Sequence, residues 1–114
     1  MATPLFVYGT LQPGRENEHL LTRIGGEWQA ASVRGTYYEK AWGLAAEYPG
    51  LVLDAEGDAV QGYLFYSEQL TAHWPDLDEF EAGYDRVSVT ALTTTGEPVT
   101  AWVYQVQPLT DNGD

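Results

Sequence analysis

Two short segments, far apart in the chain, carry residue types that could do chemistry. The first follows the apolar run 5–7, which predicts a buried strand, and precedes the strong turn signal at 12–14. Glycine in such a turn allows positive φ and close approach of a ligand, and the N–H groups can hold a carboxylate or a developing oxyanion. The alternative is an ordinary turn after an edge strand. The candidate residues are Tyr8, Gly9, Thr10 and Leu11.

The second segment is acidic, and Glu81 is its candidate for proton transfer. Glu81 follows Phe80 and lies four residues after Leu77, so on a helix it falls at the edge of the apolar face. Apolar surroundings, the helix dipole and the nearby Asp78 and Asp85 would all raise its pKa, which suits proton transfer near neutrality. The alternative is a solvated acidic face without a catalytic role. The acids of this segment are Asp76, Asp78, Glu79, Glu81 and Asp85.

Two further residues, Tyr84 and Arg86, are neighbours of the candidate acid where the helix meets the next strand. Either could contact a substrate. Arg86 is one of only five Lys and Arg residues, so it could pair with a substrate carboxylate or with an acid of the fold. A structural ion pair is the simpler interpretation for Arg86.

Other sites for chemistry are excluded by residue type or by spacing. The chain has no cysteine, which removes disulfides, thiolate zinc sites and a cysteine nucleophile. No serine stands in a nucleophile-elbow context, so the two histidines are interpreted as surface residues. The acids at 54–58 imitate the start of an EF-hand loop, but Ala59 and Phe65 stand where glycine and glutamate are needed. We therefore expect no metal site, and a hairpin turn at 54–58.

The elements that position these residues are predicted to be short strands on both sides of one helical segment. An apolar face predicts a helix over 15–24 that stops at Gly25. Ser67 is expected to cap a helical turn over 68–73, and Pro75 to begin a second helix over 75–82, with Glu79 on its polar side and a stop at Gly83. Strands are expected at 4–8, 28–38, 51–53, 60–66, 86–91 and 99–106, with a hairpin turn at 95–97.

Composition limits the class of protein and its partners. The 114 residues, of which 44% are hydrophobic, predict one globular domain over 1–114 with a flexible polar tail at 109–114. Seventeen acids against five Lys and Arg give a net charge of −12, which disfavours nucleic acid and anionic membranes as partners. No basic leader and no apolar run of about 18 residues is present, so we expect a cytoplasmic protein.

Four motifs in order resemble the gamma-glutamylcyclotransferase-like family. They are Phe-Val-Tyr-Gly-Thr-Leu at 6–11, Tyr-Pro-Gly-Leu-Val at 48–52, Leu-Asp-Glu-Phe-Glu at 77–81 followed by Tyr-Asp-Arg at 84–86, and Ala-Trp-Val-Tyr at 101–104. The resemblance spans residues 5 to about 104, and the order and spacing of the motifs are specific in combination. Ala82 departs from the family, which often has glycine directly after the glutamate; here Gly83 follows one residue later.

The resemblance implies a fold, an activity and roles for residues. The fold would be α+β, a small and mostly antiparallel β-barrel with short helices around a cavity. The activity would be cyclisation of a γ-glutamyl amide to 5-oxoproline with release of an amine or amino acid, without a metal or organic cofactor. Glu81 would be the general acid/base, and Tyr8 to Leu11 would form the substrate cradle.

Two other functions remain open from the sequence. A non-catalytic module on the same fold could bind a small amine or peptide, and a regulatory protein could use the acidic surface. The expected partner is a small γ-glutamyl molecule, and the expected state is a monomer or weak homodimer. Release of 5-oxoproline would separate the enzyme from both alternatives.

Overall fold

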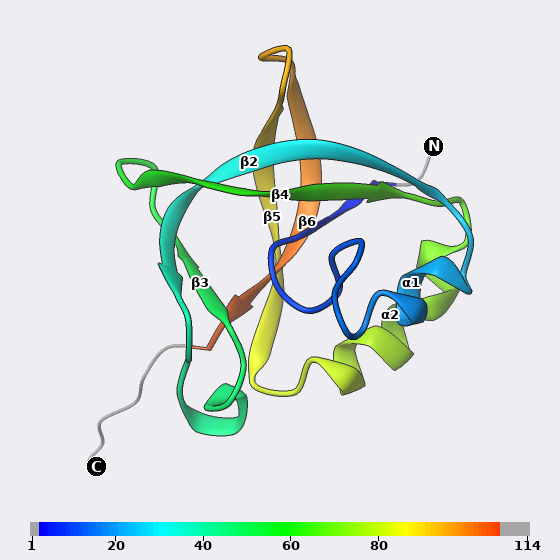
Figure 1. Ribbon diagram of the computed structural model, residues 1–114, viewed down its shortest axis with the longest axis horizontal. Coiled ribbons are helices and arrows are strands. Elements are labelled where there is room, and N and C mark those ends of the chain that lie inside the picture. Colours follow the sequence, from blue (N-terminus) through cyan, green and yellow to red (C-terminus); the bar gives the residue numbers. More distant parts are fainter. Residues whose placement is uncertain (1–2, 108–114) are drawn as a thin grey trace.

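The computed structural model describes residues 3–107. Within this range strands alternate with short helices, and the acidic segment forms the longest helix (Figure 1). The strands are β1 (Leu5–Val7), β2 (Glu27–Tyr38), β3 (Gly50–Leu53), β4 (Asp58–Tyr66), β5 (Tyr84–Thr93) and β6 (Pro98–Val106); the helices are α1 (His19–Thr22), the 3-10 turn η1 (Gly43–Ala45) and α2 (Leu70–Phe80).

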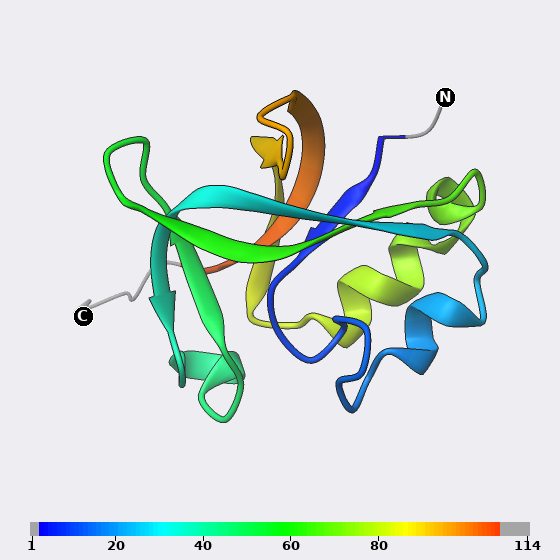
Figure 2. The ribbon, with the colours of Figure 1, turned by 45° about the horizontal axis from the view of Figure 1, so that its top comes forward.

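Five of these strands close into a barrel. Their order is β2-β4-β1-β6-β5, and β5 returns to β2 where Ala31 pairs with Thr93 and Ser32 with Leu92. β3 extends the far end of β2 outside this closed ring. The pairing of β1 with β6 is parallel and the other pairings are antiparallel, which makes the barrel mixed. In both views the helices α1 and α2 lie together at one end, away from β3 (Figures 1 and 2).

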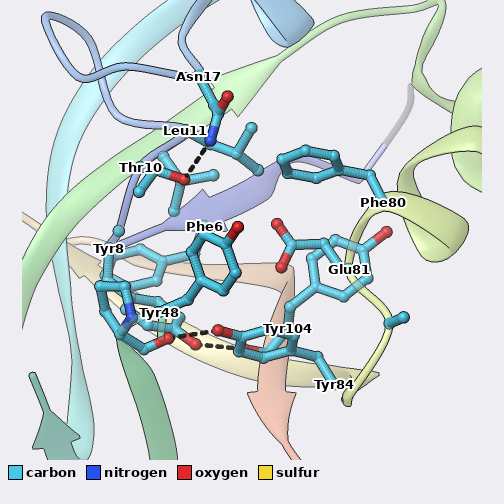
Figure 3. Close-up of a pocket in the computed structure, with 14 residues that line it drawn as sticks. Phe6, Tyr8, Thr10, Leu11, Asn17, Tyr48, Phe80, Glu81, Tyr84 and Tyr104 are labelled. Carbon is cyan, nitrogen blue, oxygen red and sulfur yellow. Dashed lines mark hydrogen bonds between the residues drawn. The ribbon is translucent and has the colours of Figure 1, made fainter. Parts of the chain in front are cut away.

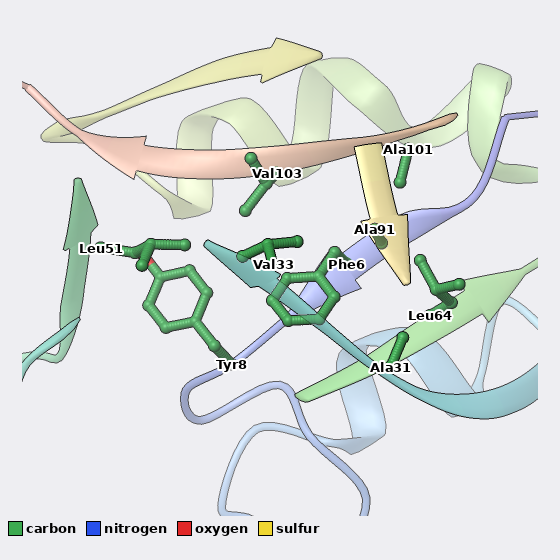
Figure 4. Packing of buried hydrophobic residues seen from close by; sticks show 9 residues of the cluster. All are labelled: Phe6, Tyr8, Ala31, Val33, Leu51, Leu64, Ala91, Ala101 and Val103. Carbon is green, nitrogen blue, oxygen red and sulfur yellow. The ribbon is translucent and has the colours of Figure 1, made fainter. Parts of the chain in front are cut away.

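The first strand is buried on both faces, which explains its uninterrupted apolar sequence. Phe6 points into the barrel, whereas Leu5 and Val7 point to the side covered by the helices. The Phe6 ring packs over Gly62, where an added Cβ would lie 2.7 Å from the ring and 2.2 Å from the Val7 carbonyl oxygen. The barrel interior contains the nine residues of Figure 4: Phe6, Tyr8, Ala31, Val33, Leu51, Leu64, Ala91, Ala101 and Val103.

The helices differ from the sequence-based prediction in two places. The segment 15–24 forms only the single turn α1, because most of residues 11–18 form hydrogen-bonded turns. The two predicted turns of 68–82 are one helix, α2, with Pro75 inside it. Pro75 and Thr71 are both exposed, so water can replace the backbone hydrogen bond that proline cannot donate. Gly83, with φ of +96°, stops the helix as predicted.

The remaining predictions concern one strand, one hairpin turn and the polar tail. β5 begins at Tyr84, two residues before its predicted start, and the hairpin turn around Gly96 is present with φ of +87°. The polar tail predicted at 109–114 lies outside the described residues. Across residues 3–107, the helices are too short and too polar to cross a membrane.

Candidate active site

A cavity of about 280 Å³ lies between the segment after β1, residues 8–11, and the end of α2. Figure 3 shows the Glu81 carboxylate directed into it, with Thr10 and Leu11 on the opposite side. The two candidate segments, 70 residues apart, therefore share one cavity, as their assignment to one site requires. Its lining is Phe6, Val7, Tyr8, Gly9, Thr10, Leu11, Asn17, Tyr48, Pro49, Phe80, Glu81, Ala82, Tyr84 and Tyr104.

The segment after β1 offers backbone donors to this cavity. Among the described residues, no hydrogen bond is donated by the N–H groups of Gly9, Thr10 or Leu11. The expected reason for a glycine here was wrong in one respect, because Gly9 does not adopt positive φ. A Cβ added to Gly9 would meet only the Pro49 ring, at 3.6 Å, which is ordinary contact. Nothing in the described fold therefore requires glycine at this position.

Glu81 is placed by the end of α2. Its N–H donates to the Leu77 carbonyl at 2.9 Å, and its own carbonyl accepts from Tyr84 N–H at 3.0 Å, as Gly83 turns the chain into β5. The side chain is half-buried, and no residue of the described range donates a hydrogen bond to its carboxylate. Burial raises the pKa of Glu81 from 4.5 to about 7. This carboxyl is therefore poised to exchange a proton near neutral pH.

The raised pKa of Glu81 was predicted, but the neighbouring carboxylates do not cause it. Arg86 forms an ion pair with Asp78, with Nε 3.0 Å from Oδ1, and this hydrogen bond lowers the pKa of Asp78. Asp85 is exposed and accepts from the Gln107 side chain. The charge of Asp78 is thus compensated by Arg86, and Asp85 is solvated. This leaves loss of water around Glu81 as the cause of its raised pKa.

Arg86 does not belong to the lining of the cavity. Its guanidinium makes a second hydrogen bond to Asp78, of 3.2 Å, and lies over the rings of Trp74 and Trp102 at 4.3 and 5.0 Å from their centroids. These contacts correspond to the structural ion pair, one of the two roles considered for Arg86. Tyr84, the other neighbour of the candidate acid, does line the cavity.

Three tyrosines of the lining have their hydroxyl hydrogens occupied within the protein. Tyr8 donates to the carbonyl of Tyr104, Tyr84 donates to the carbonyl of Pro49, and Tyr104 donates to Asp78. Burial raises the pKa of each of these hydroxyls well above its usual value. These three remain neutral phenols at neutral pH, whereas the pKa of the Glu81 carboxyl lies near neutrality.

Sequence reasoning missed several residues of the cavity wall. Tyr48 and Pro49 were assigned only to a turn, and Tyr104 only to the last strand. Asn17 was placed inside the predicted helix 15–24, but α1 begins only at His19, two residues after it. The Asn17 side chain instead donates to the Thr10 hydroxyl at 3.0 Å. A signal for Tyr48 and Tyr104 was present, since both lie in motifs that resemble the family, but their shared cavity depends on barrel closure.

The pKa of Glu81 predicts how stability depends on pH. An acid whose pKa rises on folding loses stability as the pH rises from its unfolded value, about 4.5, to its folded value, about 7. Glu81→Gln removes this cost, so we expect the variant to be more stable than the wild type by roughly 1–3 kcal/mol at pH 8. The advantage should shrink towards pH 5. Urea unfolding of both proteins at pH 5, 6.5 and 8 measures it, and an advantage independent of pH would contradict the assignment.

Comparison with known proteins identifies relatives along nearly the whole chain. A sequence model of the family described as gamma-glutamyl cyclotransferase, AIG2-like, matches residues 5–114. A Drosophila melanogaster protein, provisionally named as a gamma-glutamylcyclotransferase, is 28% identical over 116 residues, which cover 97% of this chain and 74% of the relative. YkqA of Bacillus subtilis has the same provisional name and is 31% identical over 97 residues, covering 84% of this chain and 32% of YkqA. The chain therefore spans about a third of YkqA.

Solved structures share the fold. The crystal structure of YkqA superposes with a TM-score of 0.72 and 30% identity, over 94% of this chain and 36% of that chain. An AIG2-like protein from Mus musculus superposes with a TM-score of 0.68 and 22% identity, over 95% of this chain and 79% of that chain. The predicted small barrel with short helices is therefore confirmed.

Proposed function

The chain belongs to the gamma-glutamyl cyclotransferase, AIG2-like family, and we propose that it is an enzyme that cyclises γ-glutamyl amides to 5-oxoproline. The observation that carries this proposal is the Glu81 carboxyl, with a pKa of about 7, in the same cavity as the N–H groups of Gly9 to Leu11, which have no acceptor within residues 3–107. A proton carrier and donors for a negatively charged oxygen are the two components that the reaction needs.

The reaction joins two groups of the same molecule. The α-amine of the substrate attacks its own γ-carbonyl carbon, the lactam C–N bond forms, and the bond to the leaving nitrogen breaks. Because nucleophile and electrophile are already linked, the enzyme has mainly to fold the substrate into the reactive conformer and to move one proton. In this scheme Glu81 takes the proton of the attacking amine and returns it to the leaving nitrogen.

Glu81 performs both proton transfers in this proposal because it is the carboxyl of the lining and its pKa lies near 7. The hydroxyl hydrogens of Tyr8, Tyr84 and Tyr104 are held by protein acceptors. The described lining contains no Lys, Arg or His. The N–H groups of Gly9 to Leu11 then hold either the α-carboxylate of the substrate or the oxyanion formed at its γ-carbonyl.

The lining also favours a leaving group without a carboxylate. Tyr48 and Phe80 are 50% and 46% exposed, so they form the mouth of the cavity, where the leaving group of a bound γ-glutamyl amide would lie. This mouth has aromatic rings but no cation, and the protein carries a net charge of −12. A leaving amine can contact the rings, whereas the carboxylate of a leaving amino acid would find repulsion and no counter-charge.

The test compares two substrates that differ only in that carboxylate, γ-glutamyl-tyramine and γ-glutamyl-tyrosine. We expect 5-oxoproline from both, with kcat/KM about tenfold higher for the tyramine compound, which corresponds to about 1.4 kcal/mol. Tyr48→Lys supplies a counter-charge at the mouth and should reduce this preference. Equal rates for the two compounds would contradict the assignment of the mouth. Binding of both without any 5-oxoproline would favour the non-catalytic binding module.

A further inference from the structure

Three consecutive carbonyl groups of the segment after β1 accept hydrogen bonds from donors within the protein. The Gln12 side-chain amide donates to the carbonyls of Tyr8, at 2.8 Å, and Gly9, at 3.1 Å. The Gln12 backbone N–H also donates to the Gly9 carbonyl, at 3.2 Å, which closes a turn. The Thr10 carbonyl accepts from the backbone N–H of Asn17 at 2.9 Å. The direction of each of these three carbonyl groups is thus fixed by a hydrogen bond.

This arrangement determines where the next N–H groups point. No peptide bond of the described residues is cis, and in a planar trans peptide the N–H is directed opposite to the preceding carbonyl. The N–H groups of Gly9 and Thr10 are therefore directed away from Gln12. Gly9 and Thr10 line the cavity, whereas Gln12 lines a second, more open hollow together with Tyr8, so Gln12 lies on another side of the segment. Directed away from Gln12, the two N–H groups are free to face the cavity that both residues line.

Asn17 braces the same segment from a second point. Its backbone N–H donates to the Thr10 carbonyl. Its side-chain amide donates to the Thr10 hydroxyl (Figure 3). The hydrogen bonds that Asn17 donates to this segment reach Thr10, whereas the one Gln12 amide reaches two successive carbonyls. Gln12 is thus the side chain with the greatest control over the direction of the Gly9 and Thr10 peptides.

We infer that Gln12 is a positioning residue, which keeps the N–H groups of Gly9 and Thr10 turned to the cavity so that they can bind a negatively charged oxygen of the substrate. The part that concerns the substrate rests on the proposed function. Without the side-chain donor, the Tyr8 carbonyl loses this hydrogen bond and the Gly9 carbonyl keeps the one from the Gln12 backbone N–H, so both peptides are held less firmly. Rotation would turn a carbonyl oxygen towards the cavity, where it would repel the substrate oxygen.

The test separates the ability of residue 12 to donate from its size. Gln12→Glu keeps the shape but presents only acceptors, Gln12→Met keeps the length without polarity, and Gln12→Lys restores a donor. We expect kcat/KM for an accepted γ-glutamyl amide to fall about tenfold in the first two variants, as for the loss of one to two hydrogen bonds. The lysine variant should be more active than both. Equal activity in all three variants, or a lysine variant as impaired as methionine, would overturn the inference.

A second measurement reports the peptide orientation without any substrate. Residual dipolar couplings of the Gly9 and Thr10 N–H groups should change in Gln12→Glu and Gln12→Met and stay near wild type in Gln12→Lys. Gln61→Glu, at an exposed position of β4, adds the same charge and should change neither these couplings nor kcat/KM. Unchanged couplings in the glutamate and methionine variants would overturn the positioning role. Altered couplings in a protein whose wild type turns over no γ-glutamyl amide would instead reject the proposed function and retain that role.

Discussion

Replacement of Glu81 by glutamine is expected to lower the turnover of an accepted γ-glutamyl amide by about 10²–10⁴-fold, the usual contribution of a positioned proton carrier. Glutamine keeps the size and shape of the side chain, so the cavity and its contacts should persist. It cannot take a proton from the attacking amine, and the described lining holds no second carboxylate and no Lys, Arg or His to replace it. The measurement is the initial rate of 5-oxoproline release, with the unfolding midpoint recorded alongside.

Glu79→Gln is the matched control, since it removes the same charge two residues away, in the last turn of α2. Glu79 is exposed and does not line the cavity, so its replacement should leave turnover close to that of the wild type. Wild-type turnover in Glu81→Gln would reject the proton-transfer role. An inactive Glu79→Gln variant together with an active Glu81→Gln variant would show that the catalytic acid is Glu79 and that its assignment to Glu81 is wrong.

Gly9→Ala should separate activity from stability. The added Cβ meets only the Pro49 ring, at 3.6 Å, and Gly9 does not use positive φ, so the free energy of unfolding should stay within about 1 kcal/mol of the wild type. Both Gly9 and Pro49 line the cavity, so the methyl group would occupy space next to the proposed substrate cradle. We expect kcat/KM to fall about 10²-fold, as for a substrate displaced by about 1 Å.

Gly96→Ala should give the opposite result and serves as the control. Gly96 has φ of +87° in the β5–β6 hairpin, far from the cavity lining, and its added Cβ would meet no atom within 4 Å. Alanine is strained in that conformation, so stability should fall by about 1 kcal/mol while kcat/KM is retained. If Gly9→Ala keeps wild-type kcat/KM, a substrate does not approach this part of the backbone as proposed.

Local patterns were sufficient to predict much of the framework of the site. The apolar run of β1, the stop at Gly83 and the hairpin at Gly96 depend on residues within a few positions of one another. The expected apolar face beside Glu81 is present at Leu77, which is buried, whereas Phe80 is 46% exposed and lines the cavity instead. Such short-range relations are present in the sequence itself, and the family motifs then indicated that both ends of the site belong together.

The composition of the cavity wall was decided by tertiary structure. The hydroxyl of Tyr8 donates to the carbonyl of Tyr104, 96 residues away, because β1 and β6 pair in parallel and close the barrel. The pairing of Arg86 with Asp78 removes both groups from the electrostatics of Glu81, since α2 packs beside β5. Neither contact follows from spacing along the chain.

The cause of the raised pKa at Glu81 shows the same division. The chain's spacing of acids indicated like-charge repulsion, but distance in the folded protein assigns Asp78 to Arg86 and exposes Asp85 to solvent. Desolvation depends on what covers a side chain, and around Glu81 that cover includes the segment after β1 and Tyr104 of β6, both remote from it in sequence. The sequence therefore determined that Glu81 is the acid whose pKa is raised. Its electrostatic environment was decided only by the tertiary structure, when the barrel closed around it.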